Sequence, residues 1–198
     1  YDYEIIKKAY QPQDDLSLLV TLKANGTIEK PVIASLAESL TVDRHDEADW
    51  ARLQEVFASS SLQMVSFTIT EKGYSITGPD GDFRADVKAD FAAGPDAADS
   101  YIGKLVSLCH YRYTPGKTPL ALVSMDNCSH NGDKLFAAVD AYAKAWTENG
   151  LAAEGFLAYI EDPAKVSFPW SMIDKITPRP DDSVKKMLSE CGFEDTEN

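Results

Sequence analysis

Three strand-like runs, separated by stretches with helical periodicity, most constrain what this chain can fold into. The runs cover Met64–Thr70, Leu120–Met125 and Val166–Phe168. Strands that alternate with helices in this way form right-handed crossovers and a parallel sheet. Because the first two runs are apolar along most of their length, we expect interior strands of a sheet that is covered on both faces.

Helices are predicted where apolar residues recur every three or four positions. The predicted helices cover 46–58, 97–110, 133–146 and about 182–191. Asn131 is predicted to cap the third helix at its N-terminus, and Gly192 to end the last one.

An antiparallel hairpin is predicted near the N-terminus. The runs Leu16–Leu22 and Pro31–Leu36 flank the dipeptide Asn25-Gly26, which is a strong hairpin signal. The predicted fold class is therefore α/β, with a mostly parallel sheet, flanking helices and this additional hairpin.

Charge and cysteine content limit which partners this chain can bind and in which cellular compartment it is expected. The 198 residues carry a formal net charge of −13, which repels nucleic-acid backbones and anionic lipids. The three cysteines are far apart, and no Cys/His cluster has zinc spacing. We therefore expect free thiols, no bound metal and a reducing, cytoplasmic compartment. No apolar run approaches the roughly 18 residues of a membrane span.

Polar clusters follow each of the three strand-like runs. They are Thr70–Tyr74, Asp126–Gly132 and the pair Asp174-Lys175. In open α/β sheets, ligands bind beyond the carboxyl ends of the strands. We therefore expect the three clusters to converge on one edge of the sheet and to form a site there.

Each cluster also has a simpler interpretation. Thr70–Tyr74 is compatible with a plain turn, and Asp126–Gly132 with helix capping. Asp174 and Lys175 are compatible with a solvated ion pair, worth roughly 0–1 kcal/mol. The amide of Asn127 offers two N–H donors to a carbonyl oxygen that gains negative charge.

The phosphate-binding signatures of nucleotide folds do not occur in the sequence. There is no GxGxxG, and "PGKT" (115–118) lacks the first glycine of a P-loop. The residues thus indicate a dinucleotide-type sheet without its phosphate loop. This combination is expected if residue 1 lies downstream of a first βα unit.

Four segments, in the same order, resemble the polyol-specific long-chain dehydrogenase/reductase family, which includes mannitol 2-dehydrogenase, fructuronate reductase and tagaturonate reductase. They are "PVIASLAESL" (31–40), "TITEKGY" (68–74), "MDNCSHNGDK" (125–134) and "VSFPWSMIDKITP" (166–178). The last segment matches the family signature at Val166, Phe168, Ser171, Asp174, Ile176 and Pro178. It departs at Ile173, where Val is usual, and at Lys175, where Arg is usual.

The resemblance implies an incomplete Rossmann-like domain and an NAD(P)-dependent oxidoreductase that uses no zinc. Its substrate would be a sugar alcohol or aldonate, or the matching ketose or keto acid. Asn127 and Asp174 would be catalytic, Thr70, Glu71 and Asn127 would contact NAD or NADP, and Asp174 and Lys175 would contact substrate. The family's general base, a Lys in a KxxxxNxxH motif, does not occur in this sequence.

The expected organisation is an NAD(P)-binding domain over 1–180, lacking its first βα unit. Residues 181–198 would then be the first helix and linker of a helical catalytic domain. Alone, the chain is expected to be inactive. Two alternatives remain: a non-catalytic α/β module that binds a sugar or nucleotide, and a scaffold domain that serves only for association.

Overall fold

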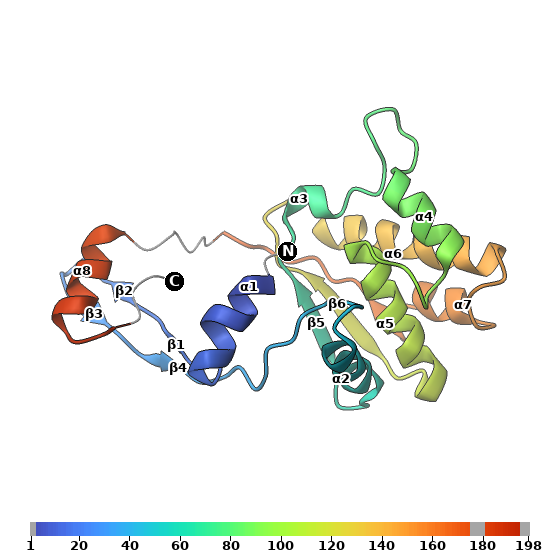
Figure 1. Cartoon of the computed structure of the whole chain (residues 1–198). Helices are drawn as coiled ribbons and strands as arrows, with labels where there is room; N and C mark the ends of the chain where they lie inside the picture. The colour runs from blue at the N-terminus through green and yellow to red at the C-terminus, as the bar shows by residue number, and fades with distance from the viewer. Residues whose placement is uncertain (1–2, 175–180, 195–198) are drawn as a thin grey trace. The chain divides into compact units, whose positions relative to one another are not determined.

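A computed structural model describes residues 3–174 and 181–194 of the chain (Figure 1). The chain divides into two compact units, each described here by itself. One unit comprises 1–41 together with 175–198, and the other comprises 42–174.

The unit 42–174 is built on a parallel sheet of three strands. β5 (Met64–Phe67), β6 (Leu120–Ser124) and β7 (Val166–Ser167) lie side by side in that order. Val65 is in register with Leu122, and Leu120 is in register with Val166. Since all three strands run the same way, their carboxyl ends meet at one edge. The predicted α/β class and the parallel direction of the strands are confirmed.

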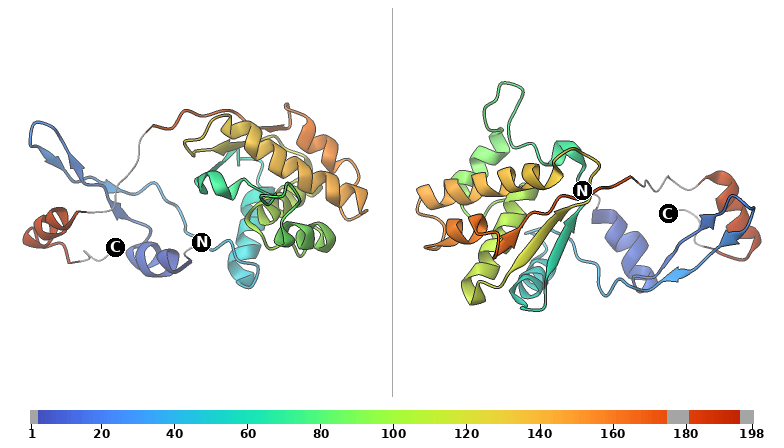
Figure 2. Two further views of the ribbon diagram at one scale, coloured as in Figure 1. Left: turned by 90° about the horizontal axis from the view of Figure 1, so that it is seen from above. Right: turned by 180° about the vertical axis from the view of Figure 1, so that it is seen from behind.

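The helices of this unit pack beside the sheet. They are α2 (Glu47–Ala58), α3 (Thr70–Gly73), α4 (Ala85–Ala93), α5 (Tyr101–Gly116), α6 (Asn131–Glu148) and α7 (Phe156–Glu161). α5 contacts both α2 and α6, while α6 lies on β6 and against α7 (Figure 2). The crossover helices thus form one layer, which buries Leu120, Leu122 and Ser124 of β6.

The prediction that the sheet is covered on both faces is wrong for β5. Met64 is 58% exposed, and Ser66 is exposed as well. β5 has β6 as its one partner strand among the described residues, so it lies at an edge of the sheet. Its alternating burial shows that one face of β5 is covered: Val65 and Phe67 pack against the core, whereas Met64 and Ser66 lie on the exposed face.

A buried carboxylate explains why α5 begins at Tyr101 rather than at the predicted residue 97. Asp90 accepts hydrogen bonds from the backbone N–H groups of Asp99 (2.8 Å) and Ser100 (3.1 Å). The Ser100 hydroxyl then caps the helix by accepting from the N–H of Gly103. The Tyr142 hydroxyl on α6 also donates to Asp90, at 3.2 Å.

Arg112 connects three segments from inside the core. It is 1% exposed, and the acceptors of its hydrogen bonds within the described residues are five backbone carbonyls. The acceptors lie at the end of α2, before β5 and before β6: Phe57, Ser59, Leu62, Thr118 and Pro119, at 2.6–3.1 Å.

The other unit contains the predicted hairpin and the last helix. β1 (Ser17–Leu18) pairs with β4 (Val32–Ile33), and β2 (Thr21–Leu22) pairs with β3 (Ile28–Glu29), all antiparallel. Gly26 has φ +83°, the left-handed conformation that the Asn-Gly turn requires. The hairpin prediction is confirmed, with shorter strands than expected.

Helical segments frame this hairpin in the sequence. Tyr3–Ile5 is α-helical, Ile6–Tyr10 is a π-helix and Gln11–Gln13 is a 3-10 helix. α8 (Asp182–Glu190) begins at the Asp181 cap and ends before Gly192, which confirms the last predicted helix. Within residues 3–174 and 181–194, no helix has both the length and the hydropathy needed to cross a bilayer.

His110 on α5 makes the stability of the unit 42–174 dependent on pH. The backbone N–H of Ala153 donates to Nε2 of His110 at 2.9 Å, so this nitrogen carries no proton. Burial lowers the pKa of His110 below its ordinary 6.5, while the nearby carboxylate of Asp96 opposes the shift. As the pH falls below 6.5, the unfolded chain takes up this proton before the folded chain does. We therefore expect His110 to lower the stability of the folded chain progressively as the pH falls below 6.5.

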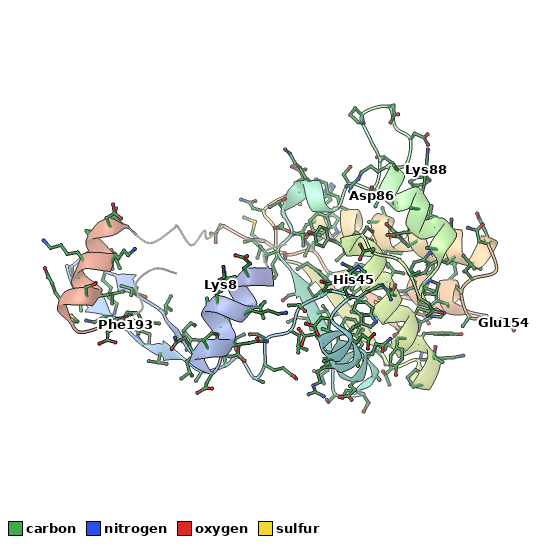
Figure 3. The ribbon with its side chains drawn as sticks, in the orientation of Figure 1. Lys8, His45, Asp86, Lys88, Glu154 and Phe193 are labelled. Carbon is green, nitrogen blue, oxygen red and sulfur yellow. The ribbon has the colours of Figure 1, made fainter. Side chains whose placement is uncertain are left out.

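The measurement is the free energy of unfolding at pH 7.5 and pH 5.5. The His110→Gln variant should lose less stability between the two pH values than the wild type loses. The same substitution at exposed His45 (Figure 3) is the matched control. An equal loss in the wild type and in His110→Gln would show that His110 does not contribute.

Candidate functional site

The carboxyl ends of β5 and β6 are joined by the carboxylate of Asp126. This side chain follows β6, is 8% exposed and accepts from the backbone N–H groups of Ile69 (2.9 Å) and Thr70 (3.0 Å) after β5. The buried Tyr74 hydroxyl donates to the same carboxylate. Burial, reinforced by this hydrogen bond, raises the pKa of the Tyr74 phenol, which keeps it protonated as a donor. Asp126 is therefore a structural residue of this edge.

The carboxyl ends of β6 and β7 are joined by Asn131. Its side chain is 1% exposed, and Nδ2 donates to the Ser171 hydroxyl at 2.8 Å and to the Ser171 carbonyl at 3.1 Å. The N–H of Ser171 donates back to Oδ1 at 3.1 Å. The Ser171 hydroxyl in turn donates to the carbonyl of Ser124, the last residue of β6. The predicted convergence is confirmed for Thr70–Tyr74 and Asp126–Gly132. The segment after β7 is joined to them through Ser171, while the place of the third cluster, Asp174-Lys175, stays a prediction.

The prediction that Asn131 caps α6 is wrong. The helix begins at Asn131, and its N-cap is His130, which has φ +54° and makes no side-chain cap bond. The Asn131 side chain turns instead toward the segment after β7. Capping therefore does not account for the polar residues of this loop.

Gly132 lets the segment after β7 pass directly over the start of α6. A Cβ atom at this position would lie 2.4 Å from the carbonyl oxygen of Phe168 and 3.0 Å from that of Pro169. Both are backbone atoms, which cannot move aside without displacing the segment. Outside this contact, the indole N–H of Trp170 donates to Asp133 at 2.9 Å, and its ring stacks on His130 at a centroid distance of 4.5 Å.

The residues predicted to bind cofactor or substrate lie around this framework. Thr70 is exposed and has φ +63°, which is rare for a β-branched residue and is held by the bond to Asp126. Glu71, on α3, forms an ion pair with Lys134 of α6 at 2.5 Å. Asn127 is exposed, and its amide forms no hydrogen bond with the described part of the chain.

Asp174 is exposed and lies three residues beyond Ser171. Lys175 lies outside the described residues. A direct approach of the Asp174 carboxylate to the Asn127 amide stays a prediction. In the described ranges, no group of three or more His, Cys, Asp or Glu side chains is arranged to hold a metal ion.

Ser171 and Trp170 were not predicted as parts of this edge, and the close approach of the backbone at Gly132 was not predicted either. Ser171 is a matched position of the family signature, which was the available signal for it. The partners of these residues lie 36–47 positions away in the chain, so local sequence pattern does not reveal the contacts.

An α/β sheet whose carboxyl edge carries exposed Thr70, Glu71 and Asn127 fits the crevice in which dinucleotide-binding folds hold their ligand. The fold is of the Rossmann type. The mannitol dehydrogenase Rossmann-domain family matches residues 4–194, and the chain belongs to this family.

Similar proteins agree with this assignment. A D-mannonate oxidoreductase of Thermotoga maritima is 43% identical over 197 residues, which cover 100% of this chain and 36% of the relative. A D-sorbitol dehydrogenase in substrate-free form has a TM-score of 0.79 at 28% identity, over 100% of this chain and 39% of that one. The Pseudomonas fluorescens mannitol 2-dehydrogenase, solved with NAD and D-mannitol, has a TM-score of 0.76 at 27% identity. This match covers 96% of this chain and 37% of that one. The chain thus spans somewhat more than a third of the length of these proteins.

Proposed function

We propose that this chain is the cofactor-binding part of an NAD(P)-dependent oxidoreductase that interconverts a sugar alcohol or aldonate with its ketose or keto acid. The observation that carries the proposal is the joining of three strand ends at one edge of the parallel sheet, in a chain of this family. The 43% identical D-mannonate oxidoreductase favours a hexonate and its keto acid, the fructuronate reductase type, as the first substrates to test.

The nicotinamide cofactor, when bound, supplies or accepts the hydride. The proposed task of Thr70 and Glu71 is to contact its ribose at the end of β5. Asn127 is proposed to contact the cofactor and to donate a hydrogen bond to the substrate oxygen as negative charge develops there. This role agrees with the exposure of Asn127 and with its unbonded amide.

Asp174 is proposed to orient the substrate or the lysine that acts as general base in this family. Lys175 is proposed to contact substrate, although an ammonium cannot reproduce the bidentate contacts of the usual Arg. The domain boundary near residue 180, a helical catalytic domain beyond it, a cytoplasmic location and the inactivity of the chain alone are parts of the same proposal.

The full-length protein that carries this chain provides the test. We expect NADH or NADPH absorbance at 340 nm to change with at least one member of a panel of hexonates, polyols and their keto forms. A non-catalytic binding module would bind a cofactor or sugar but show no turnover with any pair. That result would contradict the proposed activity and favour the alternative.

We expect Asp174→Asn to alter the pH dependence of kcat in the full-length protein. The substitution keeps the shape of the side chain but removes its charge, and the exposed position makes a folding defect small, within about 0.5 kcal/mol. The check is a pH–rate profile beside an unfolding curve. A profile that superimposes on that of the wild type would exclude an acid–base role for Asp174.

A further inference from the structure

We propose that Asn131 is a positioning residue for the reaction, because it holds the segment that carries Asp174 against the loop that carries Asn127. The inference rests on the proposed function for its catalytic consequence, and on hydrogen bonds within the unit 42–174 for its geometry. Asn131, Gly132 and Ser171 together are called the strand-end clamp below.

The side chain of Asn131 is fully used inside the clamp. Nδ2 donates to the Ser171 hydroxyl (2.8 Å), to the Ser171 carbonyl (3.1 Å) and to the Asp126 carbonyl (3.2 Å). Oδ1 accepts from the N–H groups of Gly132 (2.9 Å) and Ser171 (3.1 Å). Since this amide is buried and saturated, it cannot serve as a ligand-binding group. Its bonds connect the loop after β6 to the segment after β7.

Chain geometry limits how far the two candidate catalytic residues can move from the clamp. Asp174 is three residues from Ser171, so their Cα atoms lie within about 11 Å. Asn127 is four residues from Asn131, which gives an upper limit of about 14 Å. Asp126 fixes the other flank of Asn127 through its bonds to the turn after β5. These limits keep both candidate residues near the clamp, so a change in its bonds can displace either one.

The clamp has two independent components. One is the amide–serine hydrogen bonding, and the other is the close packing of Gly132 under the carbonyls of Phe168 and Pro169. Loss of the first component should loosen the segment 168–174 without unfolding the helix, since the second remains. A displacement of about 1 Å between reacting groups can reduce a rate about 100-fold.

Two single variants test the hydrogen-bonding component. Asn131→Asp keeps an acceptor for the Ser171 N–H but replaces the Nδ2 donor with an oxygen that faces carbonyls. Ser171→Ala removes only the hydroxyl. In the full-length protein, we expect each to lower kcat per active site about 10–100-fold. The KM for the cofactor should change less than about threefold, because the turn after β5 is held by Asp126 instead. Ser171→Thr, which keeps a hydroxyl, should retain activity.

The matched control is Tyr113→Phe. It also removes one partly buried hydrogen bond, from the Tyr113 hydroxyl to the carbonyl of Glu154, in the loop before α7 (Figure 3). This bond lies beyond the far end of α6, an 18-residue helix about 27 Å long. We expect Tyr113→Phe to lower the unfolding temperature without lowering kcat. Equal losses of kcat in the control and the clamp variants would overturn the proposal.

Hydrogen exchange gives a measurement that does not depend on turnover. In both clamp variants, amides of 168–174 should exchange at least about tenfold faster, and amides of α5 at the wild-type rate. If the amides of 168–174 exchanged at the wild-type rate in both variants, the proposed clamp would be contradicted even if kcat fell. A wild-type protein without activity on every substrate pair would contradict the proposed function alone, and the exchange data would still decide whether the clamp exists.

Discussion

The Arg112→Met variant is expected to unfold with a free energy about 3–5 kcal/mol below that of the wild type. The substitution preserves the apolar stem but removes the Arg112 donors from five backbone carbonyls. Two of these carbonyls keep another donor: Thr118 accepts from the Tyr159 hydroxyl at 2.7 Å, and Ser59 accepts from the N–H of Leu62 at 3.3 Å. Each buried acceptor that loses its partner costs about 1–3 kcal/mol, and partial relaxation or entry of water reduces the sum. For a chain of this size, we expect a fall of about 10 °C in the unfolding temperature.

Two further variants test whether the lost stability comes from the hydrogen bonds of Arg112. Arg112→Lys offers three donors in place of five, so its stability should lie between those of the wild type and Arg112→Met. Arg52→Met makes the same substitution on α2, where the arginine is 47% exposed and pairs with Glu55. We expect Arg52→Met to change the free energy of unfolding by no more than about 0.5 kcal/mol. Chemical denaturation of all four proteins is the measurement, and equal stability of Arg112→Met and Arg52→Met would refute the role of Arg112.

The Asn127→Ala variant of the full-length protein is expected to lose kcat by about 10²–10³-fold. Removal of one hydrogen-bond donor to a developing oxyanion typically has an effect of this size, equivalent to about 2.7–4 kcal/mol. Stability should hardly change, because the exposed Asn127 amide forms no hydrogen bond with the described residues. Steady-state kinetics beside thermal unfolding separates the two effects.

Asn149→Ala is the matched control for this variant. Asn149 follows α6 at its other end, where its amide donates to the carbonyl of Phe91 at 3.1 Å. We expect kcat to change less than about twofold there. If Asn127→Ala retained the wild-type kcat, the oxyanion role would have to be assigned to another residue.

The parallel order of β5, β6 and β7 was predictable because their apolar runs and the helical stretches between them are local signals. The placement of the candidate site followed from the rule that ligands bind at the carboxyl edge. The short helices α4 and α7 were missed, since nine and six residues give little periodicity to detect.

The contacts that hold the edge together were the least predictable. Asn131 resembles a helix cap in the sequence, and only the fold places Ser171, 40 residues away, beside its amide. Arg112 gives no signal at all, because its acceptors are backbone carbonyls, which every residue type supplies. The exposed face of β5 could not be predicted either, since a run such as "MVSFTIT" is compatible with a strand covered on one face or on both.

Asp126 and Asn131 stand on either side of Asn127, and each is anchored to a neighbouring strand end. The main chain between them is therefore already arranged before any ligand arrives. Binding should reorient the Asn127 side chain while leaving the path of the loop unchanged. The energetic consequence is that little reorganisation is needed as charge builds up on a substrate, and free and liganded forms should superimpose closely from Ser124 to Gly132.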